Sequence, residues 1–544
     1  MSSRLCFTLL LFDLLVRGQS GVSPVGFRNV AQQGGLDFVL HNCPTSDKRM
    51  IEAMAGGVAV FDYDGDGRPD IFFANGAEIP ALAKSGPKYW NRLYRNEGGF
   101  QFRDVTASAG VAGEGYSMGV AAADYDNDGR ADFFVAGVNR DILYHNARNG
   151  RFEDVTRGSG IRGGQWAVAA GWFDYDNDGL LDLWVVHYAK WSVEENRYCG
   201  DAGRGIRIYC HPKYFEPLPS TLYHNLGHGR FEDVSTKAGI AEFAGRGMSV
   251  AFADYDSDGY QDVFVTNDNM PNFLFRNRGN GKFEEVGLTA GVALRGDGKA
   301  VASMGADFRD YDNDGLPDIS FTALAAETFP LFRNVGKGSF DDATYSSRLG
   351  ALTVRHSGWG VGLFDFNNDG WKDLFTAGSH VNDRVEAFES AVYQETNRVF
   401  VNLHNGTFRD ESEQAGLQGE KAHRGSAYAD FDGDGKVDVV VSSLEGAAEV
   451  WQNVSPEANH WVVIKLMGVK SNRDGMGARV QIGNQHNHMT SAVSYASSSL
   501  GGMHFGLGNL SVVPEIEVIW PSGLRQTVRD MKANQVLTFR EPVR

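Results

Sequence analysis

The stretch Asp62-Tyr-Asp-Gly-Asp-Gly-Arg-Pro-Asp70 decides the fold expected of this 544-residue chain. It places carboxylates at positions 1, 3, 5 and 9 and a glycine at position 6. Alternating acids bring several oxygens to one side of a tight loop, and the glycine permits the sharp turn, as in the EF-hand loop. Four carboxylates this close repel one another unless a cation neutralises them. The spacing therefore indicates a calcium-binding loop.

The same nine-residue motif occurs seven times along the chain. Positions 1, 5 and 9 are always Asp, position 6 is always Gly, and position 3 is Asp except for Asn367. Position 2 is always aromatic, and position 4 is Gly, Asn or Ser, which tolerate unusual turn geometry. Acidic surface turns do not explain such repetition, so we predict about seven Ca²⁺ sites. The loops are residues 62–70, 124–132, 174–182, 254–262, 310–318, 365–373 and 430–438.

The predicted ligands are the side chains at positions 1, 3, 5 and 9 and the backbone carbonyl at position 7 of each loop. Because Asn367 replaces a charged oxygen with a neutral one, we expect the sixth site to be the weakest. The predicted set is Asp62, Asp64, Asp66, Arg68, Asp70, Asp124, Asp126, Asp128, Arg130, Asp132, Asp174, Asp176, Asp178, Leu180, Asp182, Asp254, Asp256, Asp258, Tyr260, Asp262, Asp310, Asp312, Asp314, Leu316, Asp318, Asp365, Asn367, Asp369, Trp371, Asp373, Asp430, Asp432, Asp434, Lys436 and Asp438.

Each loop lies within the same repeating unit. An apolar run such as 57–61 leads into the loop, and a second run such as 70–74 leaves it. A segment such as Tyr94-Arg-Asn96 and a tail such as 102–111 complete the unit. Four short apolar segments separated by turn residues predict four antiparallel strands. Seven such units predict an all-β fold, a seven-bladed β-propeller. A calcium-binding β-solenoid has repeats of about nine residues and does not fit.

The two ends of the repeat array complement each other. The seventh loop is followed by Val450-Trp-Gln-Asn453 but lacks a tail. The segment 27–36, near the N-terminus, matches the tail at 102–111 position by position. We therefore predict that the N-terminal segment supplies the last strand of the seventh blade and closes the ring.

The calcium pattern stops at Ser455-Pro456, which predicts a propeller over residues 21–456. Residues 457–544 alternate like half-buried strands and predict a small β-sandwich-like domain. Residues 1–20 carry an apolar run, 5–15, that is too short to span a bilayer and is typical of a secretory signal peptide. The chain is thus expected to be secreted and extracellular, or periplasmic in a bacterium.

The net charge and the cysteines limit the partners and the compartment that the chain can have. A net charge of −18 argues against nucleic acid and anionic membrane surfaces as partners. No segment after the N-terminus has the length and apolarity of a membrane span. Cys199 and Cys210 are expected to form a disulfide, with two reduced thiols as the alternative, and Cys43 is left over. The sequence carries no signal of oligomeric state.

Two insertions interrupt the repeats, residues 188–219 with both cysteines and residues 378–398. Insertions of this kind emerge on one face of a propeller, where a partner site is expected, although either could equally be a packing element. The main functional hypothesis is a secreted binding or adhesion module for an extracellular protein or glycan. A structural reading, in which the C-terminal domain docks a partner, stays open.

The alternative from another class is a polysaccharide lyase or hydrolase built on the channel of the propeller. Such an enzyme needs acids or bases held apart from metal, whereas most acids here belong to the loops. The sequence contains no H-E-x-x-H or P-loop motif. His380 and Asp383 are the least implausible catalytic pair. We therefore expect no enzymatic activity.

The seven D-x-[DN]-x-D-G-x-x-D loops resemble the FG-GAP/VCBS-like repeats of the integrin α-subunit propeller. Beyond residue 456, the segments 472–479, 497–508 and 518–523 resemble an ASPIC/UnbV domain. Together they resemble the secreted cartilage acidic protein family. The resemblance implies calcium binding and an extracellular fate, and it implies no particular reaction. The chain shows no cysteine-rich EGF-like segment of the kind that animal members carry, so the resemblance does not extend to adhesion roles tied to that segment.

Overall fold

The computed structural model of the protein describes residues 23–456 and 459–543. The predicted signal peptide, residues 1–20, lies outside the described residues. Within them the chain is mostly β-structure, with helices of at most five residues. The helices are α1 (Ile51–Met54), α2 (Thr106–Ala109), α3 (Thr156–Ser159), α4 (Ser235–Ala238), α5 (Gly287–Ala290) and α6 (Leu349–Thr353), with 3-10 turns η1 (Pro87–Tyr89), η2 (Pro212–Tyr214) and η3 (Val385–Ala387).

Seven units of four antiparallel strands follow one another along the chain, an arrangement consistent with propeller blades. In each unit the loop motif joins the first two strands. The units are β2 (Val58–Phe61), β3 (Asp70–Phe73), β4 (Arg92–Asn96) and β5 (Phe102–Asp104); β6 (Tyr116–Ala123), β7 (Asp132–Val138), β8 (Ile142–Asn146) and β9 (Phe152–Asp154); β10 (Ala167–Phe173), β11 (Asp182–His187), β15 (Thr221–Asn225) and β16 (Phe231–Asp233); β18 (Gly247–Ala253), β19 (Asp262–Asn267), β20 (Phe273–Asn277) and β21 (Phe283–Glu285); β22 (Ala306–Arg309), β23 (Asp318–Phe321), β24 (Leu331–Asn334) and β25 (Phe340–Asp342); β26 (Gly358–Phe364), β27 (Asp373–Gly378), β28 (Arg398–Asn402) and β29 (Phe408–Asp410); and β30 (His423–Ala429), β31 (Asp438–Ser443), β32 (Glu449–Asn453) and β1 (Phe27–Asn29).

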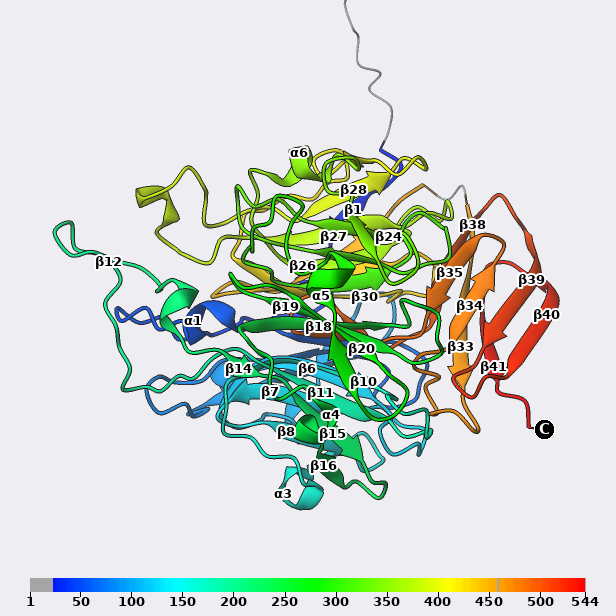
Figure 1. Cartoon of the computed structure of the whole chain (residues 1–544), viewed down its shortest axis with the longest axis horizontal. Helices are drawn as coiled ribbons and strands as arrows, with labels where there is room; N and C mark the ends of the chain where they lie inside the picture. The colour runs from blue at the N-terminus through cyan, green and yellow to red at the C-terminus, as the bar shows by residue number, and fades with distance from the viewer. Residues whose placement is uncertain (1–22, 457–458, 544) are drawn as a thin grey trace, which may run out of the picture.

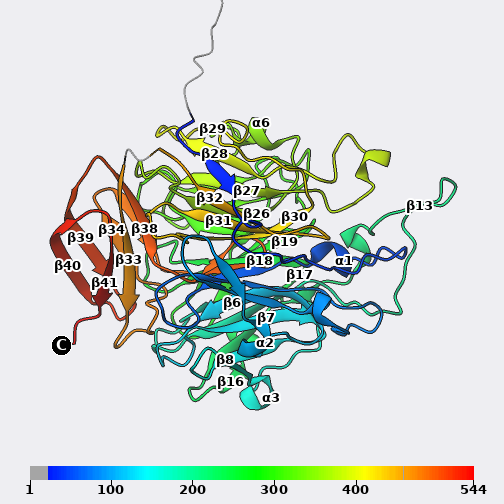
Figure 2. The ribbon, with the colours of Figure 1, turned by 180° about the vertical axis from the view of Figure 1, so that it is seen from behind.

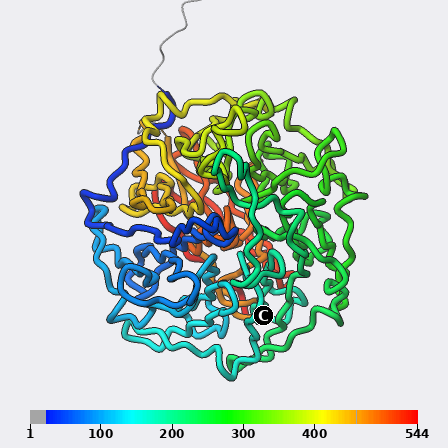
Figure 3. The backbone as a smooth tube through the Cα atoms, turned by 90° about the vertical axis from the view of Figure 1, so that its left-hand side faces the viewer, coloured from blue at the N-terminus to red at the C-terminus, as the bar shows by residue number. Residues whose placement is uncertain are grey.

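The seven units form a closed ring. Their first strands contact one another in the cycle β2, β6, β10, β18, β22, β26, β30 and back to β2, and Figure 3 shows the chain passing once around the ring. These first strands are rich in Gly and Ala because they crowd the centre: a Cβ on Gly119 would lie 2.3 Å from the carbonyl oxygen of Val168. The small residues therefore let neighbouring units approach closely.

The predicted N-terminal closure of the ring is confirmed. Strand β1 is the outermost strand of the seventh unit and pairs with β32, with Phe27 opposite Asn453 and Asn29 opposite Trp451. The first and last strands of the array thus share one sheet, and the ring has no open edge at this point.

The C-terminal segment forms two sheets that lie against one face of the ring (Figures 1 and 2). Apolar residues of both sheets, such as Val462, Val480 and Phe539, belong to one buried cluster. We call the adjacent side of the ring, which carries the seven loops, the loop face. The strands of the two sheets are β38 (Met503–Gly508), β33 (His460–Met467) and β41 (Gln535–Arg540), and β35 (Gln485–His488), β34 (Arg479–Ile482), β39 (Val512–Ile519) and β40 (Arg525–Lys532).

Residues 490–500 leave the C-terminal sheets and enter the centre of the ring; we call them the plug. Its strand β37 (Ser497–Ser499) runs parallel to β2, and β36 (Ala492–Val493) pairs with β37. Ser494 Oγ accepts hydrogen bonds from the backbone N–H groups of Val361 and Ser426, at 3.1 and 3.2 Å. The carbonyl of Ala496 accepts from Val120 at 3.0 Å. The C-terminal segment is therefore anchored inside the ring, while the predicted domain limits themselves stay a prediction.

The opposite side, which we call the insertion face, carries α1 and the two insertions (Figures 1 and 2). The hydroxyl of Tyr495 in the plug donates to the carbonyl of Met54 in α1 at 2.6 Å. Chain from the two faces therefore meets inside the ring. The short strands β12 (Gly200–Asp201), β13 (Ile206–Arg207), β14 (Leu218–Pro219) and β17 (Ala244–Gly245) lie in or beside the first insertion.

Candidate metal centres

The position-1 aspartate organises each loop. In all seven loops, its Oδ2 accepts a hydrogen bond from the backbone N–H of the position-6 glycine, at 2.7–3.0 Å. That glycine has a positive φ, +90° at Gly67, which side-chain-bearing residues rarely adopt. The constant Asp at position 1 and Gly at position 6 are therefore two halves of one turn.

Positions 5 and 7 are also coupled through the backbone. In every loop the position-7 N–H donates to Oδ1 of the position-5 aspartate, at 2.8–3.0 Å. The backbone of Arg68, Arg130, Leu180, Tyr260, Leu316, Trp371 and Lys436 thus lies next to a predicted ligand carboxylate. Their assignment as carbonyl ligands stays a prediction.

The position-9 aspartate is buried beneath the loop. Asp70 accepts the backbone N–H of Tyr63 at 3.0 Å and of Asn96 at 2.8 Å. Burial raises the pKa of Asp70 to about 8, in spite of these hydrogen bonds. Both oxygens therefore have structural partners, and each keeps a further lone pair with which it could contact a cation.

Neighbouring loops are linked by an asparagine whose role is not evident from the sequence alone. Nδ2 of Asn96 donates to the carbonyl of Pro69 in its own loop, at 3.2 Å, and to that of Phe431 in the preceding loop, at 2.9 Å. Every unit repeats the link to the preceding loop, at 2.7–3.0 Å. The only signal in the sequence is the constant Asn that ends the third strand of each unit. The linking residues are Asn96, Asn146, Asn225, Asn277, Asn334, Asn402 and Asn453.

The structure brings predicted ligands together. Ligand oxygens of the position-1, position-3 and position-5 aspartates of loop one lie within 4.8 Å of one another, as do those of loop two. In loop three one group consists of Asp174, Asp176 and Asp182, and a second joins Asp176 and Asp178 to His224. The oxygen-only groups fit the preference of Ca²⁺.

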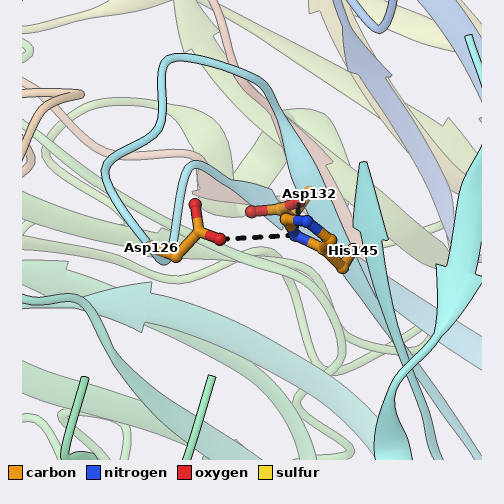
Figure 4. A group of neighbouring side chains, drawn as sticks. All are labelled: Asp126, Asp132 and His145. Atoms are coloured by element: carbon orange, nitrogen blue, oxygen red, sulfur yellow. Dashed lines mark ion pairs between the residues drawn. The ribbon is translucent and has the colours of Figure 1, made fainter. Parts of the chain in front are cut away.

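A second feature missed from the sequence is a basic side chain beside most loops. Nε of Arg95 lies 2.6 Å from Asp64, and its Nη2 lies 3.0 Å from Asp66. Arg276 and Arg333 take the same place in loops four and five. In loop two, Nδ1 of His145 lies 3.3 Å from carboxylate oxygens of Asp126 and Asp132 (Figure 4). These groups offset part of the negative charge of the loops.

Several carboxylate oxygens of the loops nevertheless have no hydrogen-bond partner among the described residues. They are Oδ2 of Asp132 and Oδ1 of Asp176, Asp256, Asp310 and Asp312, all buried. A buried carboxylate oxygen without a partner is costly, and a bound cation removes that cost. Burial also raises the pKa of Asp124 and Asp174 to about 8. The donor set therefore fits Ca²⁺.

The sixth loop differs from the others as the sequence suggested. Asn367 is buried; its Oδ1 accepts the backbone N–H of Asp369 at 3.0 Å, and its carbonyl accepts Nδ2 of Asn459 at 2.9 Å. Its neutral side chain leaves one charge fewer for a cation. That this site is the weakest stays a prediction.

The insertions contain the predicted disulfide and a predicted pair that does not form. Cys199 and Cys210 are bonded, with Cα atoms 5.3 Å apart, and Cys43 is unpaired among the described cysteines. His380 and Asp383 take separate partners. Nδ1 of His380 accepts the N–H of Asn382, and burial lowers the pKa of His380 to about 4. Asp383 pairs with Lys48 at 2.5 Å.

One further motif matches a catalytic pattern by letter. Gly115-Tyr-Ser-Met-Gly119 fits G-x-S-x-G, the nucleophile elbow of hydrolases, which lies on a sharp turn from strand to helix. Here Ser117 is buried within strand β6, opposite Gly137 in β7. The motif is therefore part of a sheet and not an elbow.

Among residues 23–456 and 459–543, no helix combines the length and apolarity needed to cross a bilayer.

Comparison with known proteins adds two family matches. An FG-GAP-like repeat model matches more than half of the chain, over residues 62–135, 125–185, 217–265, 254–321, 310–376 and 388–441. A model described as ASPIC and UnbV matches residues 468–544.

Full-length similarity extends to animal proteins. Cartilage acidic protein 1 of Mus musculus is 27% identical over 562 residues, which is 98% of this chain and 72% of that protein. Its counterpart in Homo sapiens is 26% identical over 554 residues, 98% of this chain and 70% of that protein. Among solved structures, BBS1N in complex with ARL6DN covers 78% of this chain and 94% of its own, with 9% identity and a TM-score of 0.42.

Proposed function

This chain belongs to the FG-GAP-like repeat family, and from that premise we propose that it is a calcium-stabilised seven-bladed β-propeller that binds a protein or glycan outside the cytoplasm. The calcium part of the proposal rests on the buried carboxylate oxygens of the loops that have no hydrogen-bond partner among the described residues. Side chains at positions 1, 3, 5 and 9 and the position-7 carbonyl would hold the ion, which would cross-link the first two strands of a unit. Because an asparagine side chain connects each loop to the preceding one, an ion that orders one loop would also stabilise its neighbour.

The cysteines and the N-terminal sequence support the proposed compartment. A disulfide between Cys199 and Cys210 favours an oxidising environment. The signal-peptide pattern of residues 1–20 agrees with export. Extracellular calcium is abundant enough for exposed loops of moderate affinity.

The insertion face is the proposed partner surface. Tyr198, Tyr214 and Phe388 are 46%, 48% and 43% exposed. The guanidinium of Arg204 lies 5.9 Å from the centre of the Phe388 ring, and its Nη1 donates to the carbonyl of Ala387, so the two insertions contact each other. Exposed aromatic and arginine side chains are the residue types enriched at binding interfaces.

Packing inside the ring favours binding over catalysis. The enzymatic alternative places its substrate in the channel, where the plug contacts the first strands and meets α1. His380 and Asp383, the candidate acid–base pair, are engaged elsewhere. We therefore keep recognition as the proposed activity.

A binding screen tests the proposal. Purified protein in calcium is applied to a glycan array and to immobilised extracellular proteins. We expect saturable binding that the double variant Tyr198→Ser, Tyr214→Ser abolishes. Tyr345→Ser is the matched control, because Tyr345 is 65% exposed and lies outside both insertions. If the double variant still binds, the insertion face is not the partner surface. If the protein degrades a polysaccharide without binding it stably, the enzymatic alternative replaces the binding function.

A further inference from the structure

Two of the seven loops differ from the rest in the side chain that reaches them from the third strand. The residue before the linking asparagine is Arg in loops one, four and five, Val401 in loop six and Gln452 in loop seven. In loops two and three it is a histidine, His145 and His224. A guanidinium is positively charged and has no lone pair, whereas a neutral imidazole offers a nitrogen lone pair to a metal ion. These two loops can therefore supply a nitrogen ligand from this position.

Three potential ligand groups meet at loop two. Nδ1 of His145 lies 3.3 Å from Oδ2 of Asp126 and 3.3 Å from Oδ1 of Asp132, and Figure 4 shows both carboxylates beside the ring. Nδ1 is buried and forms no well-aligned hydrogen bond to the described residues. Neighbouring ligands of a zinc ion, at bond lengths of about 2.1 Å, lie about 3.0–3.4 Å apart. The spacing of the three groups therefore fits a metal site.

The position-9 aspartate of loop two is also set differently from its counterparts. In the other six loops its Oδ2 accepts the backbone N–H of the position-2 aromatic residue, at 2.9–3.2 Å. Asp132 is fully buried, and its Oδ2 has no hydrogen-bond partner among the described residues. Such an oxygen is costly unless a cation binds it. A zinc ion lies about 2.1 Å from its ligands, closer than a water at about 2.8 Å, so it fits where water does not.

The charges around loop two favour a dication. The loop has four carboxylates, and a fifth, Oδ2 of Asp474, accepts the backbone N–H of Asp124 at 2.8 Å. Two guanidiniums, those of Arg130 and Arg473, contact acids of the loop. A neutral His145 adds no charge, so five acids face two guanidiniums. A dication offsets most of the remaining negative charge.

We propose that loop two binds a first-row transition-metal dication, of the class of Zn²⁺, through Nδ1 of His145 and the carboxylates of Asp126 and Asp132. Calcium takes oxygen ligands, whereas an imidazole nitrogen together with carboxylates suits zinc and its neighbours. The side chains of His145 and Asp126 are 24% and 23% exposed, so an ion can enter from solvent. The inference rests on the proposed function, in which the loops bind metal, and refines it for one loop. Asp126 also belongs to the oxygen group predicted to hold calcium, so the two ions compete.

Loop three offers a weaker version of the same site. Nδ1 of His224 forms a hydrogen bond with Oδ1 of Asp182 at 3.0 Å and lies 3.9 Å from Asp176. Oδ2 of Asp182 keeps its bond to the N–H of Tyr175 at 3.1 Å. An ion there must displace a hydrogen bond that His145 does not make. We therefore expect loop two to hold the ion more tightly.

Calorimetric titration of the full chain with Zn²⁺, in calcium at extracellular levels, tests the site. We expect saturable binding whose tightest site is weakened at least about tenfold by His145→Arg and by His145→Gln, a change of about 1.4 kcal/mol. Other loops carry Arg95 and Gln452 at this position, so both variants should fold and melt near the parent chain in calcium. His228→Arg, at an exposed histidine outside the loops, is the control and should bind as the parent does. His224→Arg should also leave the tightest site intact.

The outcomes separate this inference from the calcium proposal. Absence of saturable Zn²⁺ binding, or the same Zn²⁺ affinity in the parent and both His145 variants, overturns the inference. Calcium binding is titrated separately on the same protein. A chain that binds Zn²⁺ through His145 but binds no calcium would refute the calcium proposal and keep this inference. A chain that binds calcium but no Zn²⁺ would do the reverse.

Discussion

The two faces of the ring are built on different principles. The loop face repeats one set of hydrogen bonds seven times, and each set is linked to the preceding loop by an asparagine. The insertion face consists of unique contacts, including one disulfide and the ion pair of Lys48 with Asp383. Because the loop-face contacts are shared around the ring, they contribute to the stability of the whole ring. The insertion face can change without that consequence, which suits a surface of recognition.

Removal of calcium should give the largest effect. Each site adds about 2.7 kcal/mol at a hundredfold excess over its dissociation constant. Several sites together rival the stability of an ordinary domain, about 5–15 kcal/mol. We therefore expect EGTA to lower the melting temperature sharply and Asp66→Ala to lower it in part. Restoration by Ca²⁺ but not by Mg²⁺, which requires a tighter octahedral shell, is the control. A calcium-dependent turnover that disappears at constant melting temperature would instead point to a catalytic ion.

Deletion of residues 21–36 should rank second. It removes β1, so β32 becomes an edge strand that invites aggregation. We expect a lower melting temperature and oligomers in size-exclusion chromatography. A truncated protein that stays monomeric and melts with the full chain would show that the closing strand is dispensable.

The pH dependence should change sign with calcium. Burial raises the pKa of Asp70, Asp124 and Asp174 to about 8, above the value of about 3.9 in an unfolded chain. A carboxyl with a raised pKa stabilises the fold when protonated, and that contribution is lost as pH rises through the folded pKa. The chelated protein should therefore melt higher at pH 5 than at pH 8. With calcium bound, protons compete with the ion and the order should reverse. If the melting temperature depends on pH in the same way with and without calcium, these carboxylates do not hold calcium.

Breaking one link between loops should cost less. Asn277 is fully buried, and its Nδ2 donates to the carbonyls of Tyr175 and Gln261. Asn277→Ala leaves both carbonyls without this partner, a cost of about 1–3 kcal/mol in unfolding free energy. Asn280→Ala, at an exposed position three residues away, is the control and should be close to neutral. Equal melting of the two variants would mean that the link does not stabilise the ring.

The smallest effect on stability should come from the insertion face. Replacing Cys199 and Cys210 together by serine frees the first insertion but leaves the loops intact. We expect the insertion itself to open locally, because the disulfide closes a short loop within it, while the melting temperature of the ring changes little. Partner binding should weaken nonetheless. Loss of ring stability equal to that of Asn277→Ala would contradict the division between the two faces.

The same division explains what could be predicted from sequence. The sevenfold sequence repeat predicts the loops, the four strands of each unit and the closing strand, because similar segments adopt similar local structures. The plug has no period; its only signal is the high content of Ser and Ala between Ser491 and Ser499, which becomes meaningful once a narrow ring centre exists. Arg95 and His145 reach the loops from the third strand of their units, so their role depends on how the sheet brings distant segments together.

The contact between Tyr495 and Met54 has a consequence for how the protein is made. The strand that closes the ring lies near the start of the chain, and the segment that fills its centre lies near the end. The closing strand can pair only once residues 449–453 have been made, and the plug can enter only once residue 500 has been made, so the ring is completed late in synthesis. Both steps join segments more than 400 residues apart in sequence, so the first strands of the ring must wait for most of the chain before the ring is closed and filled.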